Sequence, residues 1–205
     1  MGKIRDAERT RKKILEAAKI EFFEKGYNGA RVESIAKRAG LNKQLIYHYF
    51  KGKEDLINET IAHFASSVPT TNLTLPANPV EIADFRFKVN VEHLMEFLKF
   101  TAWEAVEDLP KNSNGEESRT KVLHSYVKDM KIKQELELVP AELDPALLTL
   151  FISSITIYPL LYSNVTKMIT GMEACDPQFQ EKWSEFLRLI SERIFTEGLS
   201  KKGDS

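Results

Sequence analysis

Four polar side chains, Lys43, Gln44, Tyr47 and His48, have the spacing of one face of a short helix. They offer an ammonium group, an amide, a phenol and an imidazole, all of which donate hydrogen bonds. Ile46, which stands between them, is the apolar residue expected to face inward. Such a helix suits a recognition helix, whose N-terminal residues reach base edges in the major groove of DNA.

The segments around this face have the order of a helix-turn-helix. Residues 32–39 form a short predicted helix in which apolar residues recur at i, i+3, i+4 and i+7. Gly40 is expected to end that helix in a turn, and Asn42 is a preferred N-cap for the next helix, 42–50. Because helix-turn-helix spacings also arise by chance, this pattern alone does not settle the function.

The charge of the chain is divided unevenly. The net charge is -1, yet residues 1–53 carry 14 Lys and Arg against six acidic residues, a sum of +8, and residues 54–205 carry -9. This asymmetry indicates a polyanion-binding module joined to a body with another role, and a solvated basic face is the alternative. Residues 5–13 fit either a disordered arm that reaches a DNA groove or the charged beginning of a helix.

Helical periodicity continues along the rest of the chain, and no run of alternating β-branched residues predicts a strand. The uncharged stretch 66–79, with three prolines, is typical of an ordered loop or a mobile linker. We therefore expect an all-α fold, with an N-terminal three-helix helix-turn-helix DNA-binding domain at 1–52 and a larger C-terminal helical domain at 53–205. The predicted helices are 7–25, 32–39, 42–50, 53–67, 79–108, 118–136, 145–166 and 176–194.

Residues 145–166 contain no charged side chain and are long enough to raise the question of a membrane span. Interspersed polar residues, and flanks without aromatic and basic anchors, argue against one. We expect a central or interface helix instead, kinked at Pro159. With the apolar stripe of 176–194, it can pair with its copy across a two-fold axis. The residues assigned to this dimer interface are Leu161, Val165, Phe179, Trp183, Phe186, Leu187 and Ile190.

The sequence lacks the motifs of metal binding and catalysis. It has no Glu-x-x-His pair and no His-Glu-x-x-His, so neither a ferritin-like di-metal bundle nor a zincin is predicted. Cys175 is the only cysteine, has no evident catalytic partner, and gives no support for a secreted, disulfide-stapled scaffold. We expect a cytoplasmic protein without a signal peptide or membrane span, which is not an enzyme, holds no metal and needs no cofactor.

The longer segment 26–56 is more specific than the helix-turn-helix spacing. It carries Gly-Tyr after the first helix, Ile-Ala in the second, Ala-Gly at the turn, Tyr-x-x-Phe closing the third, and Lys-Glu-Asp-Leu opening the fourth. In these features it closely resembles the DNA-binding domain of TetR-family transcriptional regulators. The resemblance covers roughly residues 7–60, and beyond them only chain length and helical character agree.

The resemblance implies a homodimer that binds a palindromic double-stranded DNA operator, usually as a repressor. A small-molecule effector that enters the second domain is expected to release the homodimer from the operator. On the matching positions, Lys43, Gln44 and His48 are the candidates for base-edge contacts, and Tyr47 and Lys53 for phosphate contacts.

Two positions depart from the family pattern. Arg31 stands where many members have a capping Thr, so it is expected to contact a phosphate instead. Leu45 stands where a small or hydroxyl residue is frequent, and it either touches a thymine methyl group or packs inward.

The second domain contains enough aromatic residues and Met to line a pocket, although most are expected to be core. Its excess of acids favours a neutral or cationic apolar ligand. The alternatives are a TetR-like activator, a helical small-molecule-binding module without specific DNA recognition and, more distantly, an enzyme. The candidate pocket residues are Phe97, Phe100, Trp103, Tyr126, Met130, Phe151, Tyr158 and Tyr162.

Overall fold

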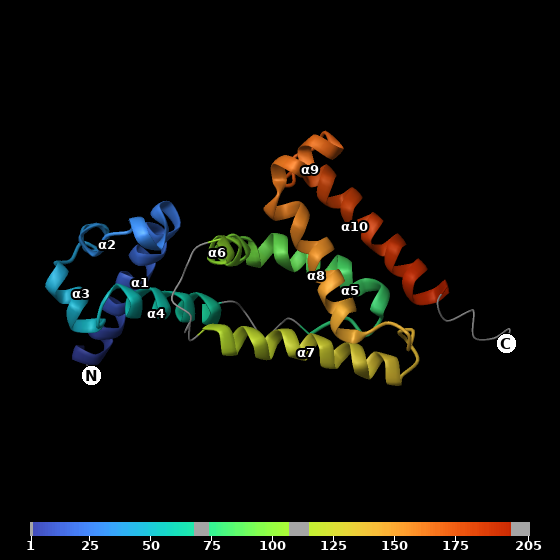
Figure 1. Cartoon of the computed structure of the whole chain (residues 1–205), viewed down its shortest axis with the longest axis horizontal. Helices are drawn as coiled ribbons and strands as arrows, with labels where there is room; N and C mark the ends of the chain where they lie inside the picture. The colour runs from blue at the N-terminus through green and yellow to red at the C-terminus, as the bar shows by residue number, and fades with distance from the viewer. Residues whose placement is uncertain (1, 68–73, 107–114, 198–205) are drawn as a thin grey trace. The chain divides into compact units, whose positions relative to one another are not determined.

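The computed structural model describes residues 2–67, 74–106 and 115–197, and every regular element in these ranges is a helix. The chain divides into two compact units, and the first contains the described residues of 1–68 and 100–120. Its N-terminal helices, blue to teal in Figure 1, are α1 (Gly2–Gly29), α2 (Val32–Ala39), α3 (Lys43–Tyr49) and α4 (Lys53–Ser67). Since α1 begins at Gly2, residues 5–13 are helical, the second of their two predicted states.

An apolar core shared by all four helices holds the first unit together. Ile14 and Phe22 of α1, Ile35 of α2, Ile46 of α3 and Leu56 of α4 are at most 1% exposed. A helix as short as α3 is not stable alone in water, so the burial of Ile46 fixes its place. The predicted domain boundary, between residues 52 and 53, falls immediately before α4, which packs against α1.

The second unit contains the described residues of 69–99 and 121–205. In its core, α5 packs against both α8 and α10. The elements of this part of the chain are η1 (Pro79–Glu81), α5 (Ile82–Val89), the π-helical turn η2 (Asn90–Leu94), α6 (Met95–Val106), α7 (Gly115–Glu135), α8 (Pro145–Leu161), α9 (Ser163–Thr170), α10 (Pro177–Glu192) and the π-helical turn η3 (Arg193–Glu197). Helices α6 and α7 have residues in both units.

The helix predicted over 79–108 is divided in the structure. It begins as the 3-10 turn η1, where Oδ1 of Asn78 accepts from the N–H of Val80 at 3.1 Å, and the π-helical turn η2 separates α5 from α6. At the start of η2, buried Asn90 donates from Nδ2 to the carbonyl of Thr156 in α8, at 3.2 Å. The hydrophobic pattern that predicts a helix does not distinguish α from π hydrogen bonding. The division of this helix at η2 therefore could not be predicted from the pattern.

Pro159 lies inside α8, two residues before the helix ends. A proline has no N–H, so the carbonyl four residues before it, that of Ile155, lacks its usual helical partner. The indole Nε1 of Trp183 in α10 donates to this carbonyl at 3.2 Å. Pro159 therefore creates a hydrogen-bond acceptor that joins α8 to α10 within the protomer.

No single helix among the described residues is long and apolar enough to cross a bilayer. The uncharged stretch predicted as one helix over 145–166 is divided between α8 and α9, which would reach that length together but are bent by 87° relative to each other.

An ion cluster ties α5 to α10. Asp84 is 5% exposed, and its Oδ2 accepts from Nε of Arg188 at 2.7 Å and from Nζ of Lys88 at 3.0 Å. Burial by itself raises the pKa of Asp84, but hydrogen bonds from Lys88, Arg188 and Ser184 outweigh it, and the net pKa lies below the ordinary 3.8.

Asp84 is expected to contribute to acid stability. Because its folded pKa is depressed, its contribution is complete above pH 3.8 and is lost as the pH falls through the lower, folded value. Thermal unfolding followed by circular dichroism from pH 7 to pH 3 is expected to show a smaller acid-side fall in Tm for Asp84→Asn than for wild type. At pH 7 the same variant is expected to lose about 1–3 kcal/mol of stability. Equal acid-side slopes would contradict this role.

Candidate nucleic-acid interface

The turn between α2 and α3 is built from local backbone chemistry. Gly40 ends α2 with φ 66° and ψ 33°, the left-handed conformation in which glycine lacks the Cβ penalty. The N–H of Leu41 then donates to the carbonyl of Ala36 at 2.9 Å. Asn42 begins α3, and its Oδ1 accepts from the N–H of Leu45 at 2.7 Å. The glycine and the cap predicted from the sequence thus fix the direction in which α3 leaves the turn.

The outer face of α3 carries the polar residues that its spacing predicts. Lys43, Gln44 and His48 are exposed, and Tyr47 is 49% exposed, whereas Ile46 is 1% exposed. The structure brings these four side chains together on one face of a helix anchored from behind. This face can donate to and accept from the edges of bases.

Lys43 already has partners within the chain. Its ammonium group is hydrogen-bonded and ion-paired to Glu33 of α2, and Nζ lies 5.7 Å from the centroid of the Tyr47 ring. The bond to Glu33 raises the pKa of Lys43 and lowers that of Glu33. The sequence analysis missed Glu33, because a partner ten residues away across a turn gives no helical spacing signal. A phosphate or base that forms a hydrogen bond with the ammonium group of Lys43 has to replace Glu33 as its partner.

Lys53, at the first position of α4, is held beside the end of α1. Its Nζ donates to the carbonyl of Asn28 at 3.3 Å and lies 4.8 Å from the centroid of Tyr27. Burial, followed by the charge of Glu54, raises the pKa of Tyr27. The N–H of Lys51 donates to Asp55 at 2.8 Å, which caps the same end of α4.

The two positions that depart from the family pattern also have definite surroundings. Arg31 is the N-cap residue of α2, and its exposed side chain makes no capping hydrogen bond, which leaves it available to a phosphate. Leu45 is partly buried on α3, between the exposed face and the core. Contact with a base and inward packing therefore both remain open to Leu45.

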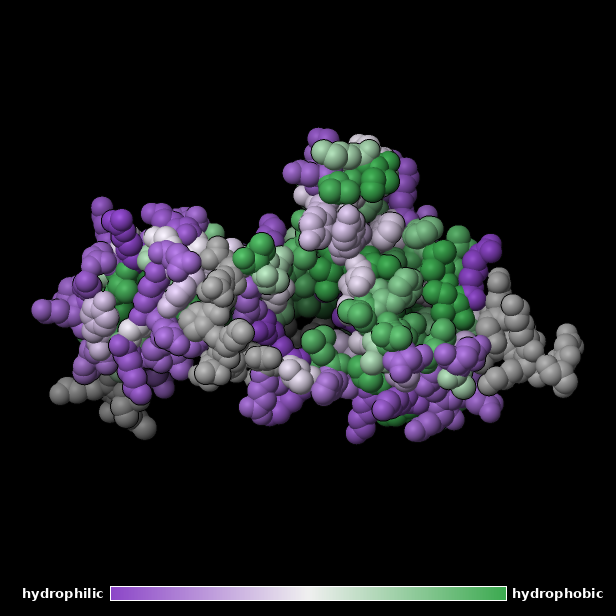
Figure 2. Space-filling model, viewed as in Figure 1, coloured by the Kyte–Doolittle hydropathy of each residue, from purple (hydrophilic) through white to green (hydrophobic). Residues whose placement is uncertain are grey.

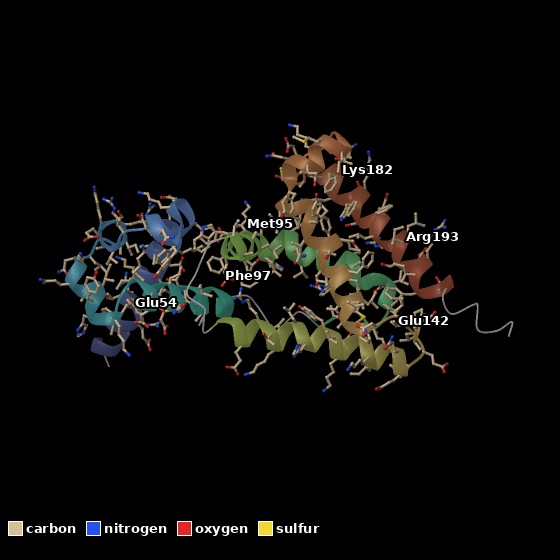
Figure 3. All side chains as sticks on the ribbon, viewed as in Figure 1. Glu54, Met95, Phe97, Glu142, Lys182 and Arg193 are labelled. Carbon is tan, nitrogen blue, oxygen red and sulfur yellow. The ribbon has the colours of Figure 1, made fainter. Side chains whose placement is uncertain are left out.

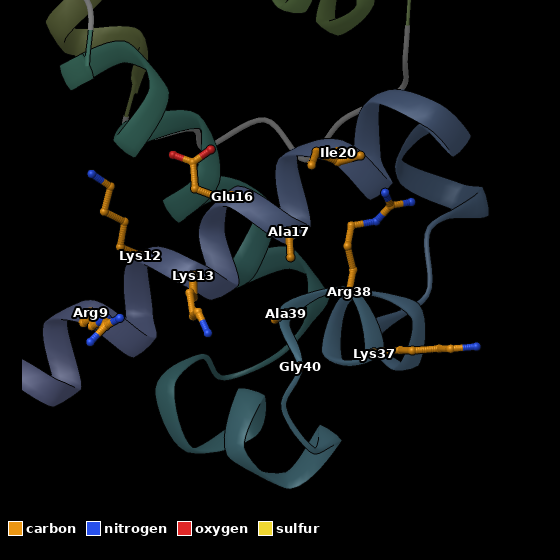
Figure 4. Close-up of a pocket in the computed structure, with 10 residues that line it drawn as sticks. All are labelled: Arg9, Lys12, Lys13, Glu16, Ala17, Ile20, Lys37, Arg38, Ala39 and Gly40. Atoms are coloured by element: carbon orange, nitrogen blue, oxygen red, sulfur yellow. The ribbon is translucent and has the colours of Figure 1, made fainter.

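A basic groove of about 640 Å³ runs between α1 and α2 (Figure 4). Arg9, Lys12, Lys13 and Lys37 line it, and none forms an ion pair with a residue in the described ranges. The spacing 9, 12 and 13 could have shown this face in the sequence.

Arg38, on the same groove, points toward α1 in Figure 4. Its Nη2 lies 2.6 Å from Oε2 of Glu24 and 3.6 Å from Oε2 of Glu21, whose side chain is 2% exposed. Arg38 therefore joins α2 to α1 by ion pairs.

The predicted pocket residues are divided between the two units. Phe100 and Trp103 belong to the core of the first unit, where their rings lie 5.4 Å and 6.0 Å from that of Phe23. Tyr126 and Met130 belong to the second unit, and Met130 is buried there.

The remaining pocket candidates are on the surface or partly buried. Phe151, Tyr158 and Tyr162 are 43–56% exposed, at one face and at the end of α8, and the last two rings stack at 4.8 Å. Phe97 is partly buried on α6 (Figure 3). The exposed aromatics face outward, so they are better placed for a partner protein than for an enclosed ligand.

The residues assigned to a dimer interface also divide by burial. Phe179 and Leu187 are 2% and 1% exposed in the protomer's own core, and Trp183 is bonded to Ile155. The side chains of Phe179 and Leu187 thus pack inside the chain, whereas partly buried Trp183 also stacks on Phe186 at 5.3 Å, and the interface assignment stays a prediction. Leu161, Val165 and Ile190 are partly buried, and Phe186 is 47% exposed.

No group of three or more His, Cys, Asp or Glu residues in the described parts of the chain could hold a metal ion. Cys175 is a free, exposed thiol.

The family model of bacterial regulatory proteins of the tetR family matches residues 14–60. The HTH-type transcriptional repressor SCO4008 of Streptomyces coelicolor is 33% identical over 105 residues, which cover 50% of this chain and 53% of that protein. The HTH-type transcriptional regulator YdgC of Bacillus subtilis is 36% identical over 92 residues, 43% of this chain and 47% of that protein. The chain thus spans about half the length of these curated relatives.

Solved structures match over most of the chain. The protein SCO4942 of Streptomyces coelicolor has a TM-score of 0.71 and 21% identity, and the match covers 91% of this chain and 98% of that one. AibR, in complex with isovaleryl coenzyme A and operator DNA, has a TM-score of 0.65 and 16% identity, over 91% of this chain and 98% of that one. At these identities the likeness shows the fold, and it confirms the predicted all-α architecture with an N-terminal helix-turn-helix. The likeness to the tetR family of bacterial regulatory proteins is thus carried by residues 14–60, and over the rest of the chain it is a likeness of fold.

Proposed function

We propose that the protein is a transcriptional repressor that binds a palindromic operator as a homodimer and is released by a small-molecule effector. The observation that carries this proposal is the exposed polar face of α3, which the Gly40 turn and the Asn42 cap hold in a fixed direction. Lys43, Gln44 and His48 would read base edges, and Tyr47 would hold a phosphate. Arg31 and Lys53 would contact phosphates on either side.

A second copy of the chain is the partner that a palindrome requires. In a homodimer the two α3 helices would enter successive major grooves about 34–36 Å apart. Apolar side chains left exposed on α8 and α10 supply a surface for the second copy: Leu147, Leu150, Phe151, Tyr158, Tyr162, Phe186 and Leu189 are 43–66% exposed. Figure 2 shows hydrophobic residues gathered over this part of the second unit and hydrophilic ones over α1–α4. An isologous contact between these faces would complete the proposed dimer.

The effector would act by population shift. A ligand in the second unit releases DNA only to the extent that it binds a non-binding conformer more tightly than the DNA-binding one. FadR of Bacillus subtilis, with a TM-score of 0.61, has been solved with stearoyl-CoA, and AibR with isovaleryl coenzyme A. These two thioesters are therefore reasonable first probes for release. We place the protein in the cytoplasm, where its operator would be.

Operator binding is expected to be sequence-specific and strongly salt-dependent. Each phosphate contact releases counterions and lowers log K by about 0.9 per unit of log salt concentration. Fluorescence anisotropy with the DNA upstream of the protein's own gene, against a scrambled duplex from 50 to 300 mM salt, measures both properties. Equal affinity for the two duplexes at every salt concentration would contradict specific regulation. It would favour the alternative function, a helical ligand-binding module without specific DNA recognition. A reporter gene that rises with the protein instead of falling would indicate an activator.

A further inference from the structure

Arg86 of α5 is a positive charge that has no negative partner among the residues the structure describes. Its Cζ lies 4.6 Å from the centroid of the Tyr126 ring in α7, and both residues belong to the second unit. No hydrogen bond or ion pair joins Arg86 to a residue in the described ranges. Asp84, two positions earlier on α5, directs its carboxylate to Lys88 and Arg188.

The surroundings of Arg86 make this unusual. Burial lowers the pKa of Arg86, and the neighbouring Tyr126 partly offsets the effect. A guanidinium remains protonated under any ordinary condition, so a buried one is normally paired. Lys133, on the face of α7 that carries Tyr126 and Met130, follows this rule, because its Nζ lies 2.6 Å from Oδ2 of Asp129. Among the described residues, the partner that the structure shows for Arg86 is the Tyr126 ring, and an aromatic ring attracts a cation less strongly than a carboxylate does.

Buried apolar residues lie close to Arg86 and Tyr126 along their own helices. Phe87, next to Arg86 on α5, is 1% exposed, and Met130, one turn beyond Tyr126 on α7, is also 1% exposed. Arg86 itself is partly buried, so its guanidinium is not sealed from solvent. A ligand that reaches it meets a positive charge beside the Tyr126 ring.

We infer that Arg86 binds the anionic head group of an amphiphilic effector whose apolar body packs near Tyr126. A carboxylate and a phosphate monoester both offer the paired oxygens that a guanidinium fork binds. The inference rests on the proposed effector binding and specifies its chemistry. It reverses the neutral or cationic ligand expected from the acid excess of the domain, because a guanidinium that contacts the head group directly would favour an anion.

The test compares three ligands of equal chain length: decanoate, decyl phosphate and decanol, each below its aggregation limit. Binding to the full chain is measured by calorimetry and by the shift in Tm. At least one anion is expected to bind wild type about tenfold or more tightly than decanol, and Arg86→Gln is expected to remove that preference. Arg193→Gln is the matched control, because Arg193 is exposed at the end of the C-terminal helix (Figure 3). The stronger of the two anions identifies the head group.

The outcomes separate the inference from the proposed function. Equal binding of decanol and both anions, absence of anion binding, or an anion preference retained in Arg86→Gln would each overturn the role of Arg86. Arg86→Lys, which keeps the charge but not the fork, is expected to recover part of the preference. If the anion binds through Arg86 but leaves the operator complex intact, the role of Arg86 in anion binding stands. The proposed release of the operator by this ligand would then be contradicted.

Discussion

Replacing Gln44 and Tyr47 together by alanine is expected to weaken operator binding by about 100-fold or more, because each lost base or phosphate contact removes about 1–3 kcal/mol. Both side chains are exposed on α3, and Ile46, which holds the helix, is untouched. The Tm is therefore expected to stay close to that of wild type. Anisotropy titration at fixed salt and thermal unfolding measure the two effects.

The control for this double variant is Lys182→Ala, since Lys182 is exposed on α10, far along the chain from α3 (Figure 3). It is expected to bind the operator like wild type. Wild-type affinity in the Gln44 and Tyr47 variant would remove α3 from the proposed interface. A loss of affinity accompanied by a large fall in Tm would indicate misfolding instead of a lost contact.

A second large effect is expected from charges placed on the apolar surface of the second unit. Leu150 of α8 and Phe186 of α10 are 62% and 47% exposed, so Leu150→Glu with Phe186→Glu leaves the protomer core intact. The four added carboxylates of a homodimer would repel one another, and the protein is expected to be monomeric by light scattering. A monomer contacts only one half-site, so operator affinity is expected to fall about 1,000-fold or more, toward nonspecific binding.

Leu136→Glu is the matched control for dimerisation. Leu136 is 63% exposed just after α7 ends and is not part of the proposed surface. This variant is expected to remain dimeric and to bind the operator. A dimer that persists in the Leu150 and Phe186 variant would show that another surface joins the copies. Trp183 is unsuitable for this test, because its bond to Ile155 belongs to the protomer.

The N-terminal elements were predictable because local chemistry determines them. Gly40 adopts the left-handed conformation expected of a helix end, and Asn42 makes the expected cap. Gly26, expected to stop the first helix, has the non-helical φ of 69° and ψ of 169° within α1, although helical structure resumes as far as Gly29. Signals of this kind depend on only a few adjacent residues, so they can be recognised without knowledge of the tertiary structure.

Side-chain partners distant in the chain could not be predicted in this way. Apolar periodicity marks α8 and α10 as hydrophobic, but it does not separate the face of Phe179 and Leu187, which is buried, from that of Phe186, which is exposed. Nor does it place Phe100 beside Phe23, or Arg86 beside Tyr126, since these pairs depend on how helices pack. The sequence therefore predicts the exposed face of α3 better than the packing of the C-terminal aromatic side chains.

The two tryptophans of the chain lie in different units. Trp103 packs beside Phe23 in the first, and Trp183 bonds to Ile155 in the second. A chain that retains only one of them has an emission spectrum governed by one unit. Intrinsic fluorescence can thus follow the melting of the first and the second unit separately, without an added dye, and can report which of the two an added ligand stabilises.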